Sequence, residues 1–139
     1  MSIKLTRQIM SAILTQAEST YPAKCFGFIV GKKEGGIATG CYYIACDKMD
    51  HIKECPLSLT DSHTYKSVKN KAGAEGLTIV SMVHTQSDFT DEPSQLDCLY
   101  SWPGITHIII SLSHGKAVSC HAWQLTNDKR SFIQEQIVQ

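Results

Sequence analysis

The stretch Leu77-Thr78-Ile79-Val80-Ser81-Met82-Val83-His84 decides how this sequence is interpreted. Its apolar and β-branched residues favour a buried β-strand, and His84 stands at the C-terminal end of that strand. Thr85 and Gln86 follow, then an acidic loop, then a helix that is predicted to open at Pro93-Ser94. Because functional side chains often sit where a strand runs into a loop, we expect chemistry at this strand end.

An amphipathic helix is predicted at the N-terminal end of the chain. Thr6 stands near its start, and the pair Tyr21-Pro22 marks its end, since proline does not continue a helix. Apolar residues recur at spacings of three and four residues, which places them on one face of a helix. They are Leu5, Ile9, Ile13, Leu14 and Ala17. We expect this apolar stripe to pack on a sheet.

The middle of the chain predicts strands and a second helix. Residues Cys25–Gly31 are typical of a buried strand, Lys32–Gly36 of a hairpin turn, and Ile37–Cys46 of the antiparallel strand that follows. After a polar connection, Pro56–Leu59 predicts a short strand. Residues Ser62–Ala74 predict the second helix.

The last third of the chain predicts three more strands. Thr106–Ser111 and Ala117–Gln124 are joined by a turn at Ser113–Lys116, and Phe132–Val138 predicts the final strand. Together these elements predict one domain over residues 1–139. The expected fold class is α/β, a mixed and mostly antiparallel sheet with a helix on each side, arranged as a sandwich.

Composition excludes several classes of protein. The 139 residues carry 13 basic and 13 acidic side chains, and they lack the basic patch of a nucleic-acid or anionic-membrane binder. Apolar runs are far shorter than the roughly 18 residues that cross a bilayer, and no secretory signal is visible, so we expect a cytoplasmic protein. The six cysteines are then expected to be mostly buried thiols.

The spacing of polar residues after the strand end resembles a known metal motif. His84-Thr85-Gln86 is followed by seven residues, then Ser94, two residues and Asp97. This resembles the signature of the MPN/JAMM metalloisopeptidase family, which has an upstream glutamate, a His-Ser/Thr-His tripeptide, seven residues, a serine, two residues and an aspartate. The retained residues agree with that spacing.

Three further segments carry the same resemblance. Tyr21–Gly31 resembles the family's Tyr-Pro-Glu-Glu-Cys-Cys-Gly-Leu-Leu-Val-Gly segment. Ser101–Gly104 and Ala122–Leu125 resemble the Ala-Trp-Pro-Gly and Ala-Trp-Arg-Leu segments of the prokaryotic JAB-like branch. The resemblance therefore covers nearly the full chain and implies an MPN/JAB-like fold, of the cytidine-deaminase-like kind.

In active members, the resemblance implies, two histidines and the aspartate bind Zn²⁺ and leave one position for water. The metal lowers the pKa of that water from ~16 toward ~7, so that it can attack an amide. The glutamate is the general base, and the serine helps to hold the oxyanion. Carried over by position, the ligand types of His84 and Asp97 and the hydroxyl of Ser94 are retained.

Two positions of the motif are substituted in this chain. Gln86 stands where the second histidine is expected, and a neutral carboxamide is a poor ligand for Zn²⁺. Lys24 stands where the general-base glutamate is expected, and a charged ammonium neither accepts a proton nor tolerates a nearby cation. The sequence therefore predicts a degenerate site formed by His84, Gln86 and Asp97 that holds no metal or other cofactor.

Other residues of the chain are alternative candidates for metal ligands or for a nucleophile. The candidate carboxylate ligands are Glu18, Asp88, Asp91 and Glu92. The candidate softer ligands are His51, His63 and Cys98. None has the family's spacing, and we expect structural or surface roles for His107, His114 and His121. A cysteine hydrolase that pairs Cys25 or Cys98 with His84 has no spacing to support it.

Two functions follow from the resemblance. The first is a catalytically inactive scaffold or binding subunit, which pairs with a ubiquitin-like protein, an intact MPN-type subunit or a second copy of itself. The alternative is a zinc-dependent isopeptidase or peptidase that cleaves conjugates of ubiquitin-like or sulfur-carrier proteins with an altered ligand set. Nucleic acid and membrane are not expected partners.

Overall fold

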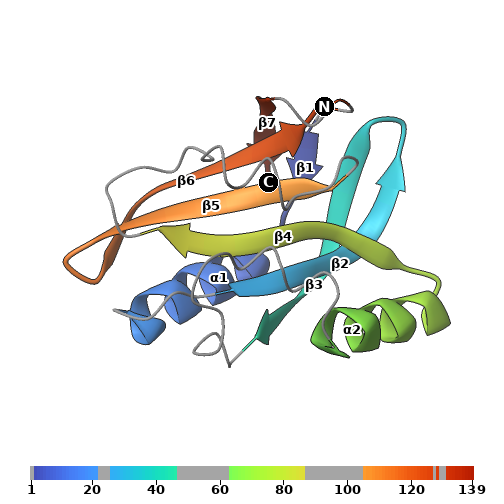
Figure 1. The fold of residues 1–139 in the computed structure, drawn as a ribbon, viewed down its shortest axis with the longest axis horizontal. Helices are drawn as coiled ribbons and strands as arrows, with labels where there is room; N and C mark the ends of the chain where they lie inside the picture. The colour runs from blue at the N-terminus through green and yellow to red at the C-terminus, as the bar shows by residue number, and fades with distance from the viewer. Residues whose placement is uncertain (1, 22–25, 47–62, 87–104, 127, 129–130) are drawn as a thin grey trace.

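The computed structural model describes residues 2–21, 26–46, 63–86, 105–126, 128 and 131–139. Seven strands and two helices lie within these residues (Figure 1). In chain order they are β1 (Ser2–Lys4), α1 (Arg7–Thr20), β2 (Phe26–Glu34), β3 (Ile37–Cys46), α2 (His63–Ala74), β4 (Thr78–Gln86), β5 (Thr106–Ser113), β6 (Lys116–Leu125) and β7 (Phe132–Val138).

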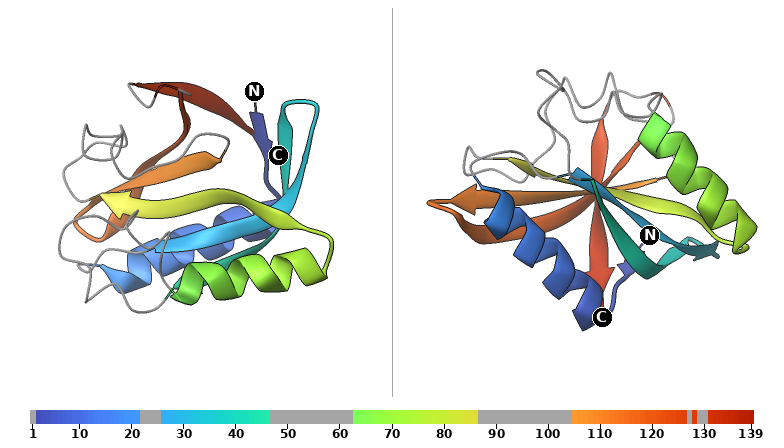
Figure 2. Two further views of the ribbon diagram at one scale, coloured as in Figure 1. Left: turned by 45° about the vertical axis from the view of Figure 1, so that its right-hand side comes forward. Right: turned by 90° about the horizontal axis from the view of Figure 1, so that it is seen from below.

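The strands form one mixed sheet in the order β1-β3-β2-β4-β5-β6-β7, and the sheet closes into a barrel (Figure 2). Four pairings are antiparallel, whereas β4–β5 and both pairings of β1 are parallel. Closure depends on β1, which pairs with β3 on one side and with β7 on the other. The predicted mixed α/β architecture is confirmed, but the sandwich arrangement is not, because the sheet closes into a barrel. The sequence did not indicate this closure, since the three residues of β1 are too few to show a strand pattern.

The N-terminal helix forms where it was predicted. The hydroxyl of Thr6 accepts a hydrogen bond from the amide of Ile9 at 3.1 Å, which is a typical N-cap. The buried residues of α1 are Ile9, Ile13 and Ala17, spaced three to four residues apart. They pack in a core cluster with residues from β1 to β6, so α1 seals one face of the sheet.

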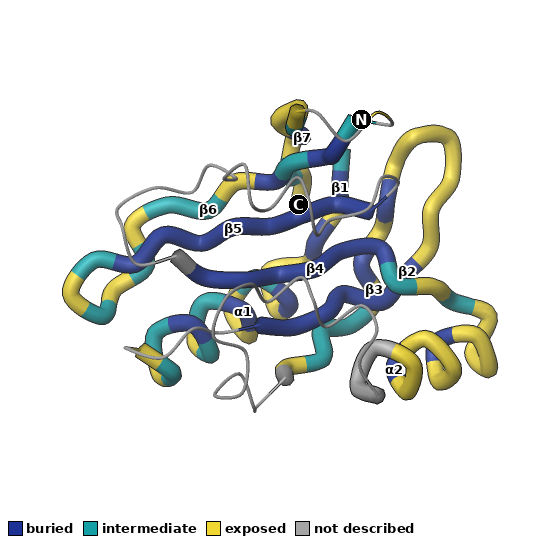
Figure 3. The backbone as a smooth tube through the Cα atoms, in the orientation of Figure 1, coloured by how far each residue is buried: buried dark blue, intermediate teal, exposed yellow. Residues whose placement is uncertain are grey.

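The second helix packs on the opposite face. Val68 and Ala72 of α2 are buried with Phe28 and Val30 of β2, whereas Ile29 belongs to the cluster around α1. Because successive side chains of a strand point to opposite faces, the two helices cover opposite sides of β2. Residues Val80–Thr85 of β4 and Thr106–Leu112 of β5 are buried (Figure 3).

Several boundaries differ from the prediction. β2 continues to Glu34, so the hairpin turn is reduced to Gly35 and Gly36, both with positive φ. β4 continues to Gln86, two residues past the predicted end. The turn between β5 and β6 forms at His114 and Gly115, which also have positive φ. The predicted strand at 56–59 and helix at 93 lie outside the described residues.

Two further findings concern membranes and thiols. Neither described helix is long and apolar enough to span a membrane. Cys41 is exposed on β3, contrary to the expectation of buried thiols, and Cys120 is half-buried. Cys41 is exposed because it follows Ile37 and Thr39 on the outward side of β3, next to Lys4 and Lys32.

Candidate functional site

The candidate site is built on the C-terminal end of β4. This strand lies between β2, with which it is antiparallel, and β5, with which it is parallel. In these two ladders His84 is the direct neighbour of Phe26 on β2 and of Ile109 on β5. His84 is only 3% exposed. Neighbouring strands on both sides thus fix the backbone of His84, and its imidazole is almost fully buried.

The side of the sheet that carries His84 is largely apolar. Phe26, Phe28 and Met82 lie on this side and are completely buried. The rings of Phe26 and Phe28 meet edge to face, with centroids 5.1 Å apart, a favourable geometry for two aromatic rings. Phe26 is the cross-strand neighbour of His84, so an apolar wall that excludes water flanks the imidazole.

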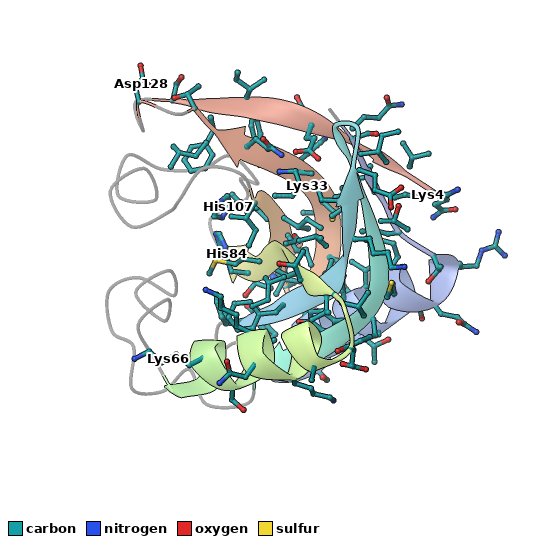
Figure 4. The ribbon with its side chains drawn as sticks, turned by 90° about the vertical axis from the view of Figure 1, so that its right-hand side faces the viewer. Lys4, Lys33, Lys66, His84, His107 and Asp128 are labelled. Atoms are coloured by element: carbon teal, nitrogen blue, oxygen red, sulfur yellow. The ribbon has the colours of Figure 1, made fainter. Side chains whose placement is uncertain are left out.

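Strand β5 adds two polar residues to the same side. His107, Ile109 and Ser111 alternate along β5 and therefore face the side that carries His84. His84 and His107 project in the same direction from neighbouring strands (Figure 4). The ring of His107 is 1% exposed and meets the ring of Phe132 edge to face at 5.7 Å. These contacts fit the structural role expected for His107.

Ser111 was not predicted as a site residue. It is completely buried, and it is the partner of Gln86 in the parallel β4–β5 ladder. Its hydroxyl has no hydrogen-bond partner among the residues that the structure describes. No motif in the sequence distinguishes Ser111 from the other residues of its β-strand. Its position at the site follows only from the register between β4 and β5.

The other predicted site residues are described incompletely. Gln86 is the last residue of β4, and only its backbone is described. Lys24, Ser94 and Asp97 lie outside the described residues, as do the alternative ligands His51, Asp88, Asp91, Glu92 and Cys98. The structure therefore places His84 and the strand end that carries Gln86. It does not test the remaining positions of the motif.

One alternative carboxylate is placed away from the site. Glu18 lies on α1, and its carboxylate accepts a hydrogen bond from the amide of Ala117 at 2.9 Å. Because α1 packs against the face of the sheet opposite His84, Glu18 is not a substitute ligand there. Within the described part of the chain, no three His, Cys, Asp or Glu side chains come together as a metal site.

A second polar cluster lies on the face that carries α1. Thr106 donates to both carboxylate oxygens of Glu135, at 3.2 and 3.1 Å, and Gln124 is a further hydrogen-bond partner. Burial raises the pKa of Glu135 above its ordinary value, although these hydrogen bonds and the charge of Lys33 oppose the shift. By strand register Thr106, Gln124 and Glu135 face away from His84, so this cluster is separate from the candidate site.

Comparisons with solved structures support the architecture. A solution structure of a protein from Salinibacter ruber shares 26% identity with this chain at a TM-score of 0.74, over 98% of this chain and 90% of that one. A solution structure from Desulfitobacterium hafniense shares 22% identity at a TM-score of 0.78, over 98% and 91%. A JAB1/MPN domain protein from Archaeoglobus fulgidus shares 17% identity at a TM-score of 0.58, over the full length of both chains.

Sequence comparison identifies the family directly. No curated protein sequence matches this chain. The family model of prokaryotic homologues of the JAB domain matches residues 6–126. This range runs from the N-cap of α1 to the end of β6 and includes β4, β5 and every position of the His84 motif. The chain therefore belongs to the prokaryotic homologues of the JAB domain.

Proposed function

We propose that this protein is a catalytically inactive JAB domain that binds, and does not cleave, a ubiquitin-like protein or an intact MPN-type partner. The observation that carries this proposal is the identity of the residue that ends β4. In this family that strand end is expected to present two histidines, and here it presents His84 and then Gln86. The strand that aims the ligands is retained, whereas one of the ligands is not.

The donor set does not suit Zn²⁺. An imidazole from His84 and a carboxylate from Asp97 leave the metal one ligand short, since a carboxamide from Gln86 is a weak donor to zinc. Lys24 adds a positive charge where the resemblance places a general base, and repulsion between cations weakens metal binding further. A hydrolytic step through a metal therefore lacks a complete ligand set in this chain. His84 is then expected to stabilise the fold or to contact a bound partner.

Retention of the framework supports a binding role. The buried side chains of Phe26, Phe28 and Met82 still surround the strand end, and both helices pack on the sheet. A fold supports many functions, so the loss of two chemical groups need not abolish a binding surface. A homodimer is a further assembly consistent with this role.

Binding and cleavage assays with defined proteins test the proposal. The probes are ubiquitin and a sulfur-carrier protein of the same fold, each tested free and as a linear fusion through its C-terminus. We expect binding of the free protein, and fusions that stay intact during prolonged incubation with added zinc. The melting temperature of the purified chain should not rise with zinc. A ligand raises the melting temperature only if it binds the folded state, and we expect no such binding of zinc.

The opposite result identifies the alternative function. Zinc-dependent cleavage of either fusion, lost in the variant His84→Ala, would establish an isopeptidase with an altered ligand set and contradict the proposal. Ser81→Ala is a suitable control for that variant, because Ser81 lies on the same strand but faces the opposite side of the sheet. Binding without cleavage in both His84→Ala and wild type supports the non-catalytic role.

A further inference from the structure

A groove crosses the sheet over β1, β3 and β2, away from the end of β4. Its volume is about 380 Å³, and the residues that line it are Lys4, Lys32, Glu34, Ile37, Thr39 and Cys41. A cavity of this size falls within the range of sites that bind small molecules. Lys32 follows Phe26, the cross-strand neighbour of His84, by six residues. The groove is therefore about 20 Å along β2 from the candidate site.

Strand register places two lysines on either side of one hydroxyl. Thr39 pairs with Lys32 in the antiparallel β2–β3 ladder and with Lys4 in the parallel β1–β3 ladder. Residues paired in this way share one face of a sheet, so the three side chains project to the same side. Neighbouring strands lie about 4.8 Å apart, which puts the Cα atoms of the two lysines about 10 Å apart with Thr39 between them.

A β-bulge fixes the backbone beside this row. The register between β2 and β3 shifts at Val30 and Gly31, and Cys41 is the extra residue of β3 that has no partner in the ladder. A bulge bends its strand and redirects the side chains next to it. A Cβ atom added at Gly31 would clash with the carbonyl oxygen of Thr39. The sequence thus permits the close strand approach that holds Thr39 and its neighbours in place.

The charge of the row is positive. Lys4 and Lys32 are exposed, and within the described ranges neither forms a salt bridge with a carboxylate. Glu34 is the acidic residue of the groove, but it pairs with Ile37 and so belongs to the next row on this face. Like charges held close together repel each other. An anion placed over Thr39 would relieve this repulsion and be attracted by both lysines.

The donors of the row match a phosphoryl group. A lysine ammonium only donates hydrogen bonds, and a threonine hydroxyl can also donate. Three strands therefore direct three donors at one point, and a phosphate monoester presents three acceptor oxygens with a charge of about −1.5 to −2 at neutral pH. A carboxylate carries one charge and balances the two lysines less well. Ile37, which is 49% exposed, provides an apolar contact for the organic part of the ligand.

We propose that this groove binds a small phosphate monoester, with its phosphoryl group over Thr39 between Lys4 and Lys32 and its organic part against Ile37. The inference goes beyond the proposed function, because the groove is separate from the strand end that carries His84 (Figure 4). Lys4 belongs to the strand that closes the barrel. The complete site therefore exists only in the folded protein, and its ligand should stabilise that state.

Three probes test the ligand class. They are phenyl phosphate, inorganic phosphate and phenol, each titrated into the full chain by calorimetry at low ionic strength, with the melting temperature recorded in parallel. Phenyl phosphate should bind more tightly than inorganic phosphate and should raise the melting temperature, whereas phenol alone should do neither. Added salt should weaken the binding, because the groove is open to solvent and its charges are screened.

Substitutions of the row test the geometry. Lys4→Gln, Lys32→Gln and Thr39→Val should each raise the Kd of phenyl phosphate about three- to tenfold, because each removes one contact to the phosphoryl group in an exposed site. Lys66→Gln is the matched control. Lys66 is an exposed lysine of α2 that lies away from Lys4 (Figure 4), and its replacement makes the same change in net charge without changing the groove. Its Kd should equal that of wild type.

Three results would overturn the inference. In the first, wild-type protein binds neither phenyl phosphate nor inorganic phosphate. In the second, Lys66→Gln weakens binding as much as Lys4→Gln, which would show general attraction of anions by the protein charge. In the third, phenyl phosphate and inorganic phosphate bind equally well, so that the ligand is the inorganic ion. None of these results depends on whether a ubiquitin-like protein binds.

Discussion

Phe26 of β2 lies directly opposite His84 of β4 in an antiparallel ladder. In an antiparallel ladder the two strands run in opposite directions, so residues before a position on one strand are matched by residues after its partner on the other. Lys24 precedes Phe26 by two residues, and Gln86 follows His84 by two. Gln86 ends β4, whereas Lys24 precedes β2 in the sequence and lies outside the described residues. Because both positions flank the Phe26–His84 pair in the sequence, we expect changes at the two positions to influence each other.

The double variant Lys24→Glu with Gln86→His should restore a metal site. His84 and Asp97 already stand at the family's spacing, so Gln86→His alone should recover most of the zinc affinity, and Lys24→Glu should add to it by removing a positive charge. Zinc stoichiometry and affinity should be measured for wild type, both single variants and the double variant in one buffer. Hydrolysis is expected to return less readily, because it also requires an oriented base and amide.

A histidine placed elsewhere controls for unspecific metal binding. Gln134→His adds an imidazole to the exposed part of β7, away from the strand end, and should not recover zinc affinity. A double variant that folds normally but binds no zinc would show that Lys24 or Gln86 does not occupy the family's site position. The prediction is then wrong at the level of the motif, although the fold is unaffected.

A second prediction concerns how β2 accommodates β3. A Cβ atom added at Gly27 would lie 2.2 Å from the hydroxyl oxygen of Tyr43 and 2.5 Å from its Cε1. Tyr43 donates a hydrogen bond to Gln16 of α1, so the ring cannot move without breaking that contact. Gly27→Ala should therefore lower the free energy of unfolding by about 1–3 kcal/mol in chemical denaturation.

Two further variants separate this clash from a general effect of alanine. Gly73 of α2 has no atom within 4 Å of an added Cβ, so Gly73→Ala should stabilise the helix by roughly 0.5–1 kcal/mol. Combining Gly27→Ala with Tyr43→Leu should cost less than the sum of the two single changes, because the smaller side chain makes room. Strict additivity would show that Tyr43 does not limit the space at Gly27.

The third prediction concerns the pH dependence of stability through Glu135. Because burial raises the pKa of Glu135, the folded state binds its proton more tightly than the unfolded state. This contribution to stability is complete below the unfolded pKa of about 4.5 and is lost as pH rises through the higher folded pKa. Glu135→Gln removes the titration, so its melting temperature relative to wild type should increase as pH rises above 4.5.

Glu34→Gln is the matched control for that experiment. Glu34 lies at the exposed end of β2, so Glu34→Gln makes the same replacement away from the buried Thr106–Glu135 cluster. Melting temperatures of the three proteins should be recorded at closely spaced pH values from 4 upward, about where a glutamate begins to ionise. A Glu135→Gln curve that stays parallel to wild type would contradict the proposed effect of burial.

Local patterns predicted most of the secondary structure. Thr6 and the apolar spacing of α1 predicted that helix, and the strands at Ile37–Cys46 and Phe132–Val138 form with the predicted bounds. Barrel closure could not be predicted, because it depends on Ser2–Lys4, whose three residues gain their stability from pairing with strands distant in sequence. Tertiary pairing of this kind leaves no local signal.

The candidate site was predicted only along one strand. The position of His84 near the end of β4 followed from the sequence. The position of Ser111 next to Gln86 could not be predicted from the sequence, because it depends on the parallel register between β4 and β5, two strands separated by a long connection. A one-residue shift of that register would turn Ser111 to the opposite face. Side-chain chemistry could therefore be inferred from the motif, but not the contribution of β5.

The zinc content of the purified wild-type protein tests the central claim most directly. Elemental analysis after exposure to excess zinc and removal of unbound metal gives the number of equivalents retained by the folded chain. With Gln86 and Lys24 in place of a ligand and a base, we predict much less than one equivalent, and no change when His84 is replaced by alanine. One equivalent of zinc that is retained by wild type and lost in His84→Ala would contradict the account.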